Sequence, residues 1–151
     1  MLAWIRSLKP IFIENSRVPV LLSYVSPINI NAISFGIFVW SRSTMDERVR
    51  RHETIHFQQQ IELLFVFQWL LYGSFWLINL IKYRDGALAY WESPFEREAY
   101  DNDEREGYLE TRPFYNWIGY INNEIKKKYG KFVLIATIPC SPSSNESNSL
   151  I

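Results

Sequence analysis

The sequence is poor in cysteine and has no net charge. Cys140 is the only cysteine of 151 residues, so no internal disulfide can form and nothing calls for an oxidising compartment. Sixteen basic and sixteen acidic residues cancel, which leaves no overall field to attract nucleic acid. We therefore expect no nucleic-acid partner. We expect a cytoplasmic or membrane-associated location, or a virion-associated one if the chain is phage-encoded.

Several functional signatures are also missing. The sequence contains no internal repeat, no glycine-rich phosphate loop and no GxSxG elbow, and its N-terminus lacks the long apolar run of a secretory signal. The hydrophobic content of 48% is enough for one core. We expect a single domain over residues 1–140 and a disordered Ser/Asn-rich tail over residues 141–151. The aromatic content of 17% is high, so rings must be buried or shown to a partner or lipid.

Both histidines of the chain stand in one short motif. Arg51 is followed by His52-Glu53-Thr54-Ile55-His56, an HExxH signature. Residues four apart lie on the same face of an α-helix, so His52 and His56 can bind one metal ion while Glu53 lies beside that ion. This is the ligand-and-base pattern of zinc hydrolases.

The residues before the motif predict the helix that it needs. Thr44-Met45-Asp46-Glu47 reads as a capping box, in which the Thr44 hydroxyl and the Glu47 carboxylate cap the first turn. The helix is therefore expected to begin near Met45, and no glycine or proline interrupts it before Gly73.

A second motif extends the match to a known family. The run from His52 to Gln59, followed by Pro94-Phe95-Glu96-Arg97-Glu98-Ala99-Tyr100, resembles the gluzincin pattern HExxH…ExxAD. It is most similar to short bacterial and phage-encoded proteins that read HExxHxxQQ…ERExA. The resemblance implies that Glu96 is the third zinc ligand. Tyr100 stands where the family has an aspartate that supports a ligating histidine, and Asp101 comes one position late.

The residues around Glu96 allow another interpretation of it. Ser93, Pro94 and Glu96 also form a capping box, so the Glu96 carboxylate can instead cap its own helix. Glu98 is expected to be a solvated helix residue.

The resemblance implies an α+β, zincin-like fold, with the HExxH helix after a short N-terminal sheet. It implies a zinc metallopeptidase that hydrolyses a peptide or protein substrate with a zinc-activated water and Glu53 as general base. Tyr90, Tyr100, Tyr108 and several arginines are candidates for stabilising the oxyanion. The alternative function is a membrane- or virion-associated structural or assembly protein that keeps the scaffold.

The N-terminal part of the chain predicts the sheet. Ile11–Ile13 and Val18–Val25 read as short extended segments, the second confined to a sheet edge by Pro19. The stretch Ile28–Trp40 is the best strand. It is either an edge that pairs with an extended substrate, as in gluzincins, or a plain core strand.

The stretch Leu63–Ile81 carries no charge and is close to the length of a membrane span. If Glu96 binds the same ion as the histidines, the chain must return, because irregular backbone cannot cross lipid. We therefore expect an apolar helical extension or a hairpin that turns near Gly73. It would be buried in the domain, dipped into one leaflet or packed on a protein partner. The alternative is that Leu63–Ile81 is a true membrane span.

The part of the chain after the Glu96 motif begins with a charged segment. Residues 101–112 are expected to continue the Glu96 helix towards solvent. Beyond Pro113, apolar residues at helical spacing over residues 114–125 predict a helix that stops in the basic run of residues 126–130, and residues 132–138 predict a last strand.

Overall fold

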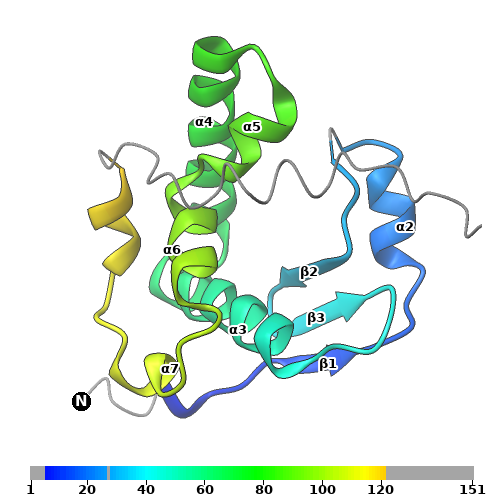
Figure 1. Cartoon of the computed structure of the whole chain (residues 1–151), viewed down its shortest axis with the longest axis vertical. Helices are drawn as coiled ribbons and strands as arrows, with labels where there is room; N and C mark the ends of the chain where they lie inside the picture. The colour runs from blue at the N-terminus through cyan, green and yellow to red at the C-terminus, as the bar shows by residue number, and fades with distance from the viewer. Residues whose placement is uncertain (1–5, 27, 122–151) are drawn as a thin grey trace, which may run out of the picture.

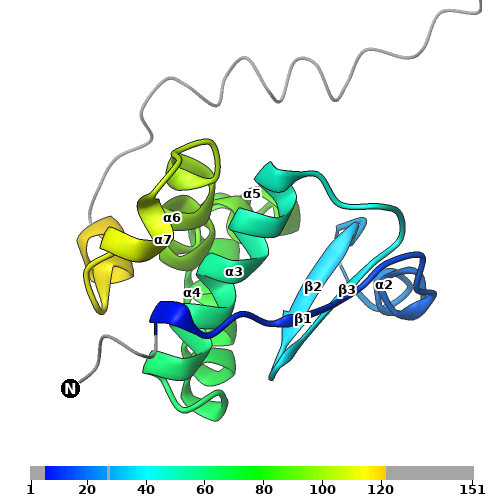
Figure 2. The ribbon, with the colours of Figure 1, turned by 90° about the horizontal axis from the view of Figure 1, so that it is seen from below.

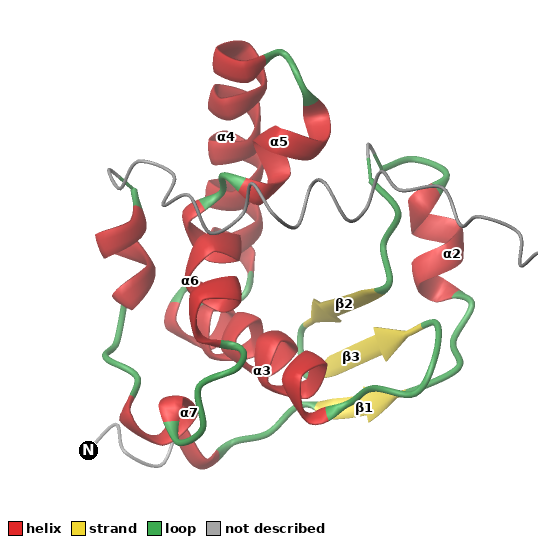
Figure 3. Ribbon diagram, viewed as in Figure 1, coloured by secondary structure: helices red, strands yellow, loops and turns green. Residues whose placement is uncertain are grey.

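The computed structural model of the protein describes residues 6–26 and 28–121. In these ranges most of the helices gather on one side of a small three-stranded sheet and the short helix Val18–Ser23 lies on the other, which confirms the α+β class (Figures 1 and 3). The predicted strand over residues 132–138, the end of the 114–125 helix and the tail lie outside the described residues. In chain order the elements are β1 (Ile11–Ile13), α2 (Val18–Ser23), β2 (Ala32–Phe35), β3 (Phe38–Ser41), α3 (Glu47–Glu62), α4 (Val66–Tyr83), α5 (Gly86–Trp91), α6 (Pro94–Asn102), α7 (Tyr108–Thr111) and the 3₁₀-helix η1 (Asn116–Tyr120).

The sheet has the order β1-β3-β2, with β1 parallel and β2 antiparallel to β3. The single strand predicted over Ile28–Trp40 is wrong, because the chain reverses at Gly36. That residue has a φ of 63°, which glycine adopts without a Cβ clash, and it begins the two-residue loop of a hairpin. The reversal leaves β3 in the centre of the sheet and makes β2 an edge strand.

The extended segment predicted over Val18–Val25 is also wrong, since residues Val18–Ser23 form helix α2. Proline is tolerated in the first turn of a helix because the amide it lacks has no partner there. The Ser16 side chain accepts from the amide of Val18 at 3.2 Å and so supports this first turn. The strand preference of valine is too weak to override such local contacts.

Helix α3 carries the HExxH motif, as predicted, but its N-cap is Asp46 and not Thr44. The Asp46 carboxylate accepts from the amide of Val49 at 2.8 Å. Every residue from His52 to Gln60 is buried, because α3 packs against β2 on one side and α6 on the other (Figure 2). The motif therefore lies in the middle of the domain.

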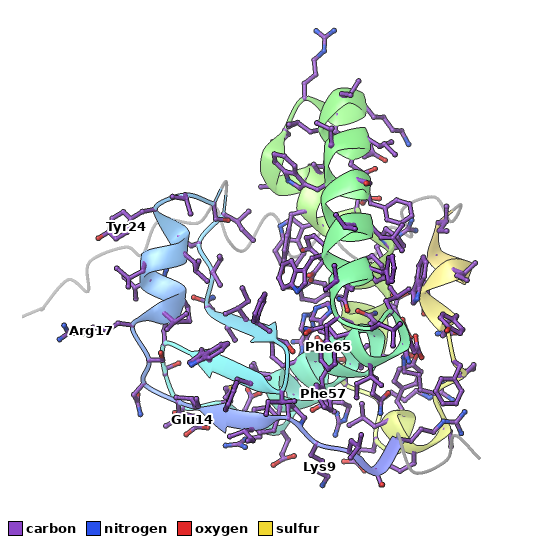
Figure 4. All side chains as sticks on the ribbon, turned by 180° about the vertical axis from the view of Figure 1, so that it is seen from behind. Lys9, Glu14, Arg17, Tyr24, Phe57 and Phe65 are labelled. Carbon is purple, nitrogen blue, oxygen red and sulfur yellow. The ribbon has the colours of Figure 1, made fainter. Side chains whose placement is uncertain are left out.

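The chain bends by 111° between α3 and α4, and the bend lies at Leu64 and Phe65. Both residues have positive φ, 51° and 62°, and the amide of Val66 donates to the carbonyl of Leu64 at 2.7 Å, which closes a strained γ-turn (Figure 4). The hairpin predicted at Gly73 is wrong in its position, because α4 runs through Gly73 without a break. Among the described residues no single helix is long and apolar enough to cross a membrane, and α3 with α4 qualifies only as this bent pair.

The return of the chain follows α4. Helix α4 ends at Tyr83, its C-cap Arg84 adopts the left-handed conformation, and α5 then packs back along it. The side chains of Trp76 and Asn79 donate to the carbonyls of Gly86 and Ala89, at 3.1 and 3.2 Å, and fix this packing. The turn back brings α6, and Glu96 with it, against α3 (Figure 1).

The segment after α6 differs from the predicted solvent-facing helix over residues 101–112. Helix α6 ends at Asn102, and the short helix α7 follows after a turn. The side chains of Asp103 and Arg112 are buried rather than solvated. Tyr108 joins Ile55 and Ala99 in the hydrophobic core.

Candidate metal centre

Three buried side chains from two helices converge on one point. His52 and His56 stand one turn apart on α3, and Glu96 comes from the first turn of α6. The two Nε2 atoms are 3.2 Å apart. They lie 3.5 Å (His52) and 3.3 Å (His56) from the two carboxylate oxygens of Glu96. No ligand atom of the set is further than 4.8 Å from another, so the group can hold a metal ion.

These distances suit a small tetrahedral ion. Metal–ligand bonds of about 2.0–2.1 Å give a tetrahedron whose edges are about 3.3–3.4 Å long. The two histidine nitrogens are 3.2 Å apart, and each lies near that edge length, at 3.5 and 3.3 Å, from a different oxygen of Glu96. The Oε2 atom of Glu96 is buried without a hydrogen-bond partner, which is costly unless a cation is bound there. Two imidazole nitrogens and one carboxylate are ligands that suit such an ion.

The hydrogen bonds of Gln59 fix the orientation of His56. The Gln59 amide nitrogen lies 2.9 Å from Glu98 Oε2 and 3.2 Å from the carbonyl of Phe95, both of which only accept. Its oxygen must therefore be the atom that lies 2.9 Å from His56 Nδ1. Because that oxygen accepts, Nδ1 carries the proton and Nε2 presents its lone pair to the centre.

Asp103 supports the other histidine. Its Oδ2 lies 3.4 Å from Nδ1 of His52, and its Oδ1 lies 3.1 Å from the Arg48 guanidinium. The ring of Tyr100 packs on the His52 ring with centroids 4.4 Å apart. The supporting aspartate is therefore neither at the Tyr100 position nor at Asp101. Asp103 is the helical C-cap residue of α6, two turns after Glu96, so the two side chains lie on the same face of the helix.

Glu96 does not cap its own helix. The amide of Ser93 donates to the carbonyl of Tyr90 instead, and the Ser93 side chain makes no cap bond. The Glu96 carboxylate accepts from the hydroxyl of Tyr72, on α4, at 2.9 Å and otherwise faces the histidines. Sequence reasoning missed Tyr72, because only the bend between α3 and α4 brings it here.

The charges of the site balance one another. Burial lowers the pKa of His52, but the neighbouring carboxylates of Asp103 and Glu96 raise it to about 10. Burial alone would raise the pKa of the Glu96 carboxyl, yet His56 and His52 hold it below its usual range. The centre therefore keeps an ionised carboxylate, which is the form that binds a cation.

Glu53 lies beside the three potential ligands and is not one of them. It is buried, and its Oε2 atom has no hydrogen-bond partner. Burial raises the pKa of its carboxyl, although the two histidines oppose that shift. A carboxylate with a raised pKa and a free oxygen is a better base than an exposed one.

Glu98 is part of a buried ionic cluster, so its predicted exposure is wrong. It is completely buried and accepts from Arg112 at 2.6 and 3.1 Å, from the Tyr108 hydroxyl at 2.8 Å and from Gln59. Arg112 also pairs with Glu62 at the end of α3. A chain of hydrogen bonds therefore runs from His56 through Gln59 to this cluster, and it ties both ligand-bearing helices to the segment after α7.

A cleft of about 970 Å³ opens over the centre. His52, Glu53, His56 and Glu96 line it, together with one face of α4 and with β2 and the residues before it. The Gln60 side chain accepts from the amide of Gly36 at 2.8 Å and donates to the carbonyl of Ser34 at 2.9 Å, so it holds the β2 edge beside α3. Of the tyrosines considered for the oxyanion, Tyr90 and Tyr100 line the cleft, whereas Tyr108 binds Glu98 instead.

The opposite face of α4 is apolar and exposed. The side chains that share it are more than half exposed: Phe67, Leu70, Leu77, Ile78 and Ile81. In the whole of α4, Gln68 is the only buried residue.

No known family model matches this sequence, and no curated protein or solved structure is similar enough to count as a match. The function must therefore be inferred from the chemistry of the site.

Proposed function

We propose that the protein is a zinc-dependent peptidase of the gluzincin type. The observation that carries the proposal is the meeting of His52, His56 and Glu96 in a cleft where the Glu53 carboxylate also has a free oxygen. A purely structural metal site has no need of a buried and unpartnered carboxylate beside it. Two histidines and one glutamate also leave a fourth position for water, as catalytic zinc sites do.

The three ligands would hold zinc, which lowers the pKa of a bound water towards neutrality and polarises a carbonyl oxygen. Glu53 accepts the proton of the attacking water and returns it to the departing amine. Tyr72 holds the Glu96 carboxylate, while Gln59 and Asp103 hold the histidine rings. Tyr90 and Tyr100 are the candidates for donating to the oxyanion, because their side chains line the cleft.

The substrate is a peptide that lies along β2. An extended peptide can pair with the exposed edge of a sheet through its main chain. Strand β2 is such an edge, and it lines the cleft together with the residues before it. Gln60 already occupies the carbonyl of Ser34, so the free part of this edge lies towards Ala32.

The test separates chemistry from metal binding. Glu53→Gln should keep the zinc and lose peptide hydrolysis, because an amide cannot accept the proton. Glu47→Gln is the matched control, since Glu47 is exposed on the first turn of the same helix. The measurement is cleavage of a mixed peptide library, followed by mass spectrometry with and without chelator. Turnover by the Glu53→Gln variant equal to that of the wild type would rule out this mechanism.

A second candidate function, attachment to an anionic lipid surface, is favoured by the exposed apolar face of α4. The chain from Leu63 to Arg84 contains no acidic residue and ends in Lys82 and Arg84, which suits negatively charged headgroups. The double variant Leu70→Glu/Ile78→Glu should lose binding to phosphatidylserine vesicles in a sedimentation assay. Binding that persists unchanged, or a wild-type dimer that this variant dissociates, would exclude the lipid assignment.

A further inference from the structure

One face of α4 forms a wall of the cleft beside the candidate metal centre. The residues of α4 that line the cleft are Gln68, Trp69, Tyr72, Gly73 and Trp76. This wall carries no charged side chain, and three of its members are aromatic. Figure 1 shows α4 standing next to α6, which carries Glu96.

Gly73 interrupts this aromatic wall. It lies one turn from both Trp69 and Trp76 on the helix surface. A Cβ atom built on Gly73 would meet nothing within 4 Å, and its φ is not in the left-handed region. Neither a turn nor a close backbone approach requires glycine there, although glycine destabilises a helix interior relative to alanine. What its absent side chain provides is open space in the wall.

We propose that this space is the subsite for a large apolar side chain, aromatic or leucine-like, of the peptide substrate. The inference rests on the proposed peptidase function. Trp69 and Trp76 line the same wall and offer apolar contact to such a group. A charged side chain would find no charged partner on this face of α4, whose residues in the cleft are all uncharged. The subsite therefore selects for apolar residues and against charged ones.

A second observation on the same wall points to a peptide. Gln68 is 4% exposed, and its Oε1 atom is buried without a hydrogen-bond partner. A buried acceptor that lacks a donor is costly, and a ligand N–H group would satisfy it. The main-chain amides of a peptide supply such donors. Gln68 is thus assigned as the residue that fixes the position of the peptide along α4.

The test fills the space and leaves the rest of the wall intact. Gly73→Leu adds bulk inside the cleft, and Ser74→Leu adds the same bulk on the outer face of α4, where Ser74 does not line the cleft. Gly73→Ala should raise the melting temperature by about 2–4 °C, because alanine favours the helix. Melting curves of all three variants establish that they fold.

Binding is measured by NMR on the tryptophan indole N–H signals, with N-acetyl-phenylalanine amide and N-acetylglycine amide as probes. These probes require no metal and no turnover. We expect the phenylalanine probe to shift the signals of Trp69 and Trp76 and to bind about tenfold more tightly than the glycine probe. Gly73→Leu should abolish this difference, and Ser74→Leu should keep it.

The outcomes distinguish the subsite from the peptidase activity. Equal binding of the two probes to the wild type, or a preference that survives in Gly73→Leu, would overturn the subsite. A protein that shows the preference but cleaves no peptide would overturn the peptidase and support the subsite. Cleavage beside apolar residues that Gly73→Leu redirects to small residues would support both.

Discussion

Replacing Glu98 by glutamine should destabilise the protein strongly, although Glu98 lies outside the metal centre. Its carboxylate accepts five hydrogen bonds, two of them from Arg112 and the others from Tyr108, Asn116 and Gln59. Glutamine keeps the size of the side chain but removes its charge. It also turns one oxygen into an NH₂ group that faces donors.

The magnitude follows from the burial of the ion pair. Breaking a buried pair by removing one partner costs about 3–5 kcal/mol, since the other charge is left without compensation. Arg112 keeps its contact with Glu62, so we expect the lower end, about 3 kcal/mol. At about 2–4 °C per kcal/mol, the melting temperature should fall by roughly 6–12 °C.

The assay is urea denaturation followed by tryptophan fluorescence, with thermal melting as the second measurement. Glu110→Gln is the matched control, because Glu110 is exposed on α7, close to Arg112 in the chain. It should change the free energy of unfolding by less than about 0.5 kcal/mol. A loss below about 1 kcal/mol in Glu98→Gln would refute the claim that this cluster ties the helices together.

Two further predictions concern the positioning of the site. Asp46→Ala should lower the free energy of unfolding by about 1 kcal/mol, whereas Thr44→Ala should hardly change it, because the Asp46 carboxylate caps α3. Urea denaturation measures both, and a larger loss in Thr44→Ala than in Asp46→Ala would contradict this assignment. Asp103→Asn should weaken zinc binding about 10–100-fold, because the Asp103 carboxylate holds Nδ1 of His52. Competition with a fluorescent chelator measures the zinc affinity, and an unchanged affinity would show that Asp103 does not position His52 for the metal.

Local patterns predicted the helix of the site well. His52 and His56 are the only histidines, and their spacing has a meaning only on a helix, so motif and structure agree on α3. The α+β class followed from the same resemblance. The residue that caps helix α3 was harder to predict. Both Thr44 and Asp46 can cap a helix, and the structure uses Asp46.

The contacts that surround the ligands could not be predicted from local patterns. The bend at Leu64 and Phe65 uses residues that rarely adopt positive φ, so no local pattern marks them, whereas Gly73 is an ordinary helix residue in the structure. Glu98 and Asp103 stand in a charged segment that reads as solvated. Their partners, Arg112 and His52, become neighbours only after the chain has turned back.

The most direct test of the account is the zinc content of the purified protein, measured by plasma mass spectrometry. We predict about one zinc per chain in the wild type and in Glu53→Gln, and none in His56→Ala or Glu96→Ala. The control variant Glu47→Gln should match the wild type. Stoichiometric zinc retained in His56→Ala or in Glu96→Ala would contradict the centre formed by His52, His56 and Glu96.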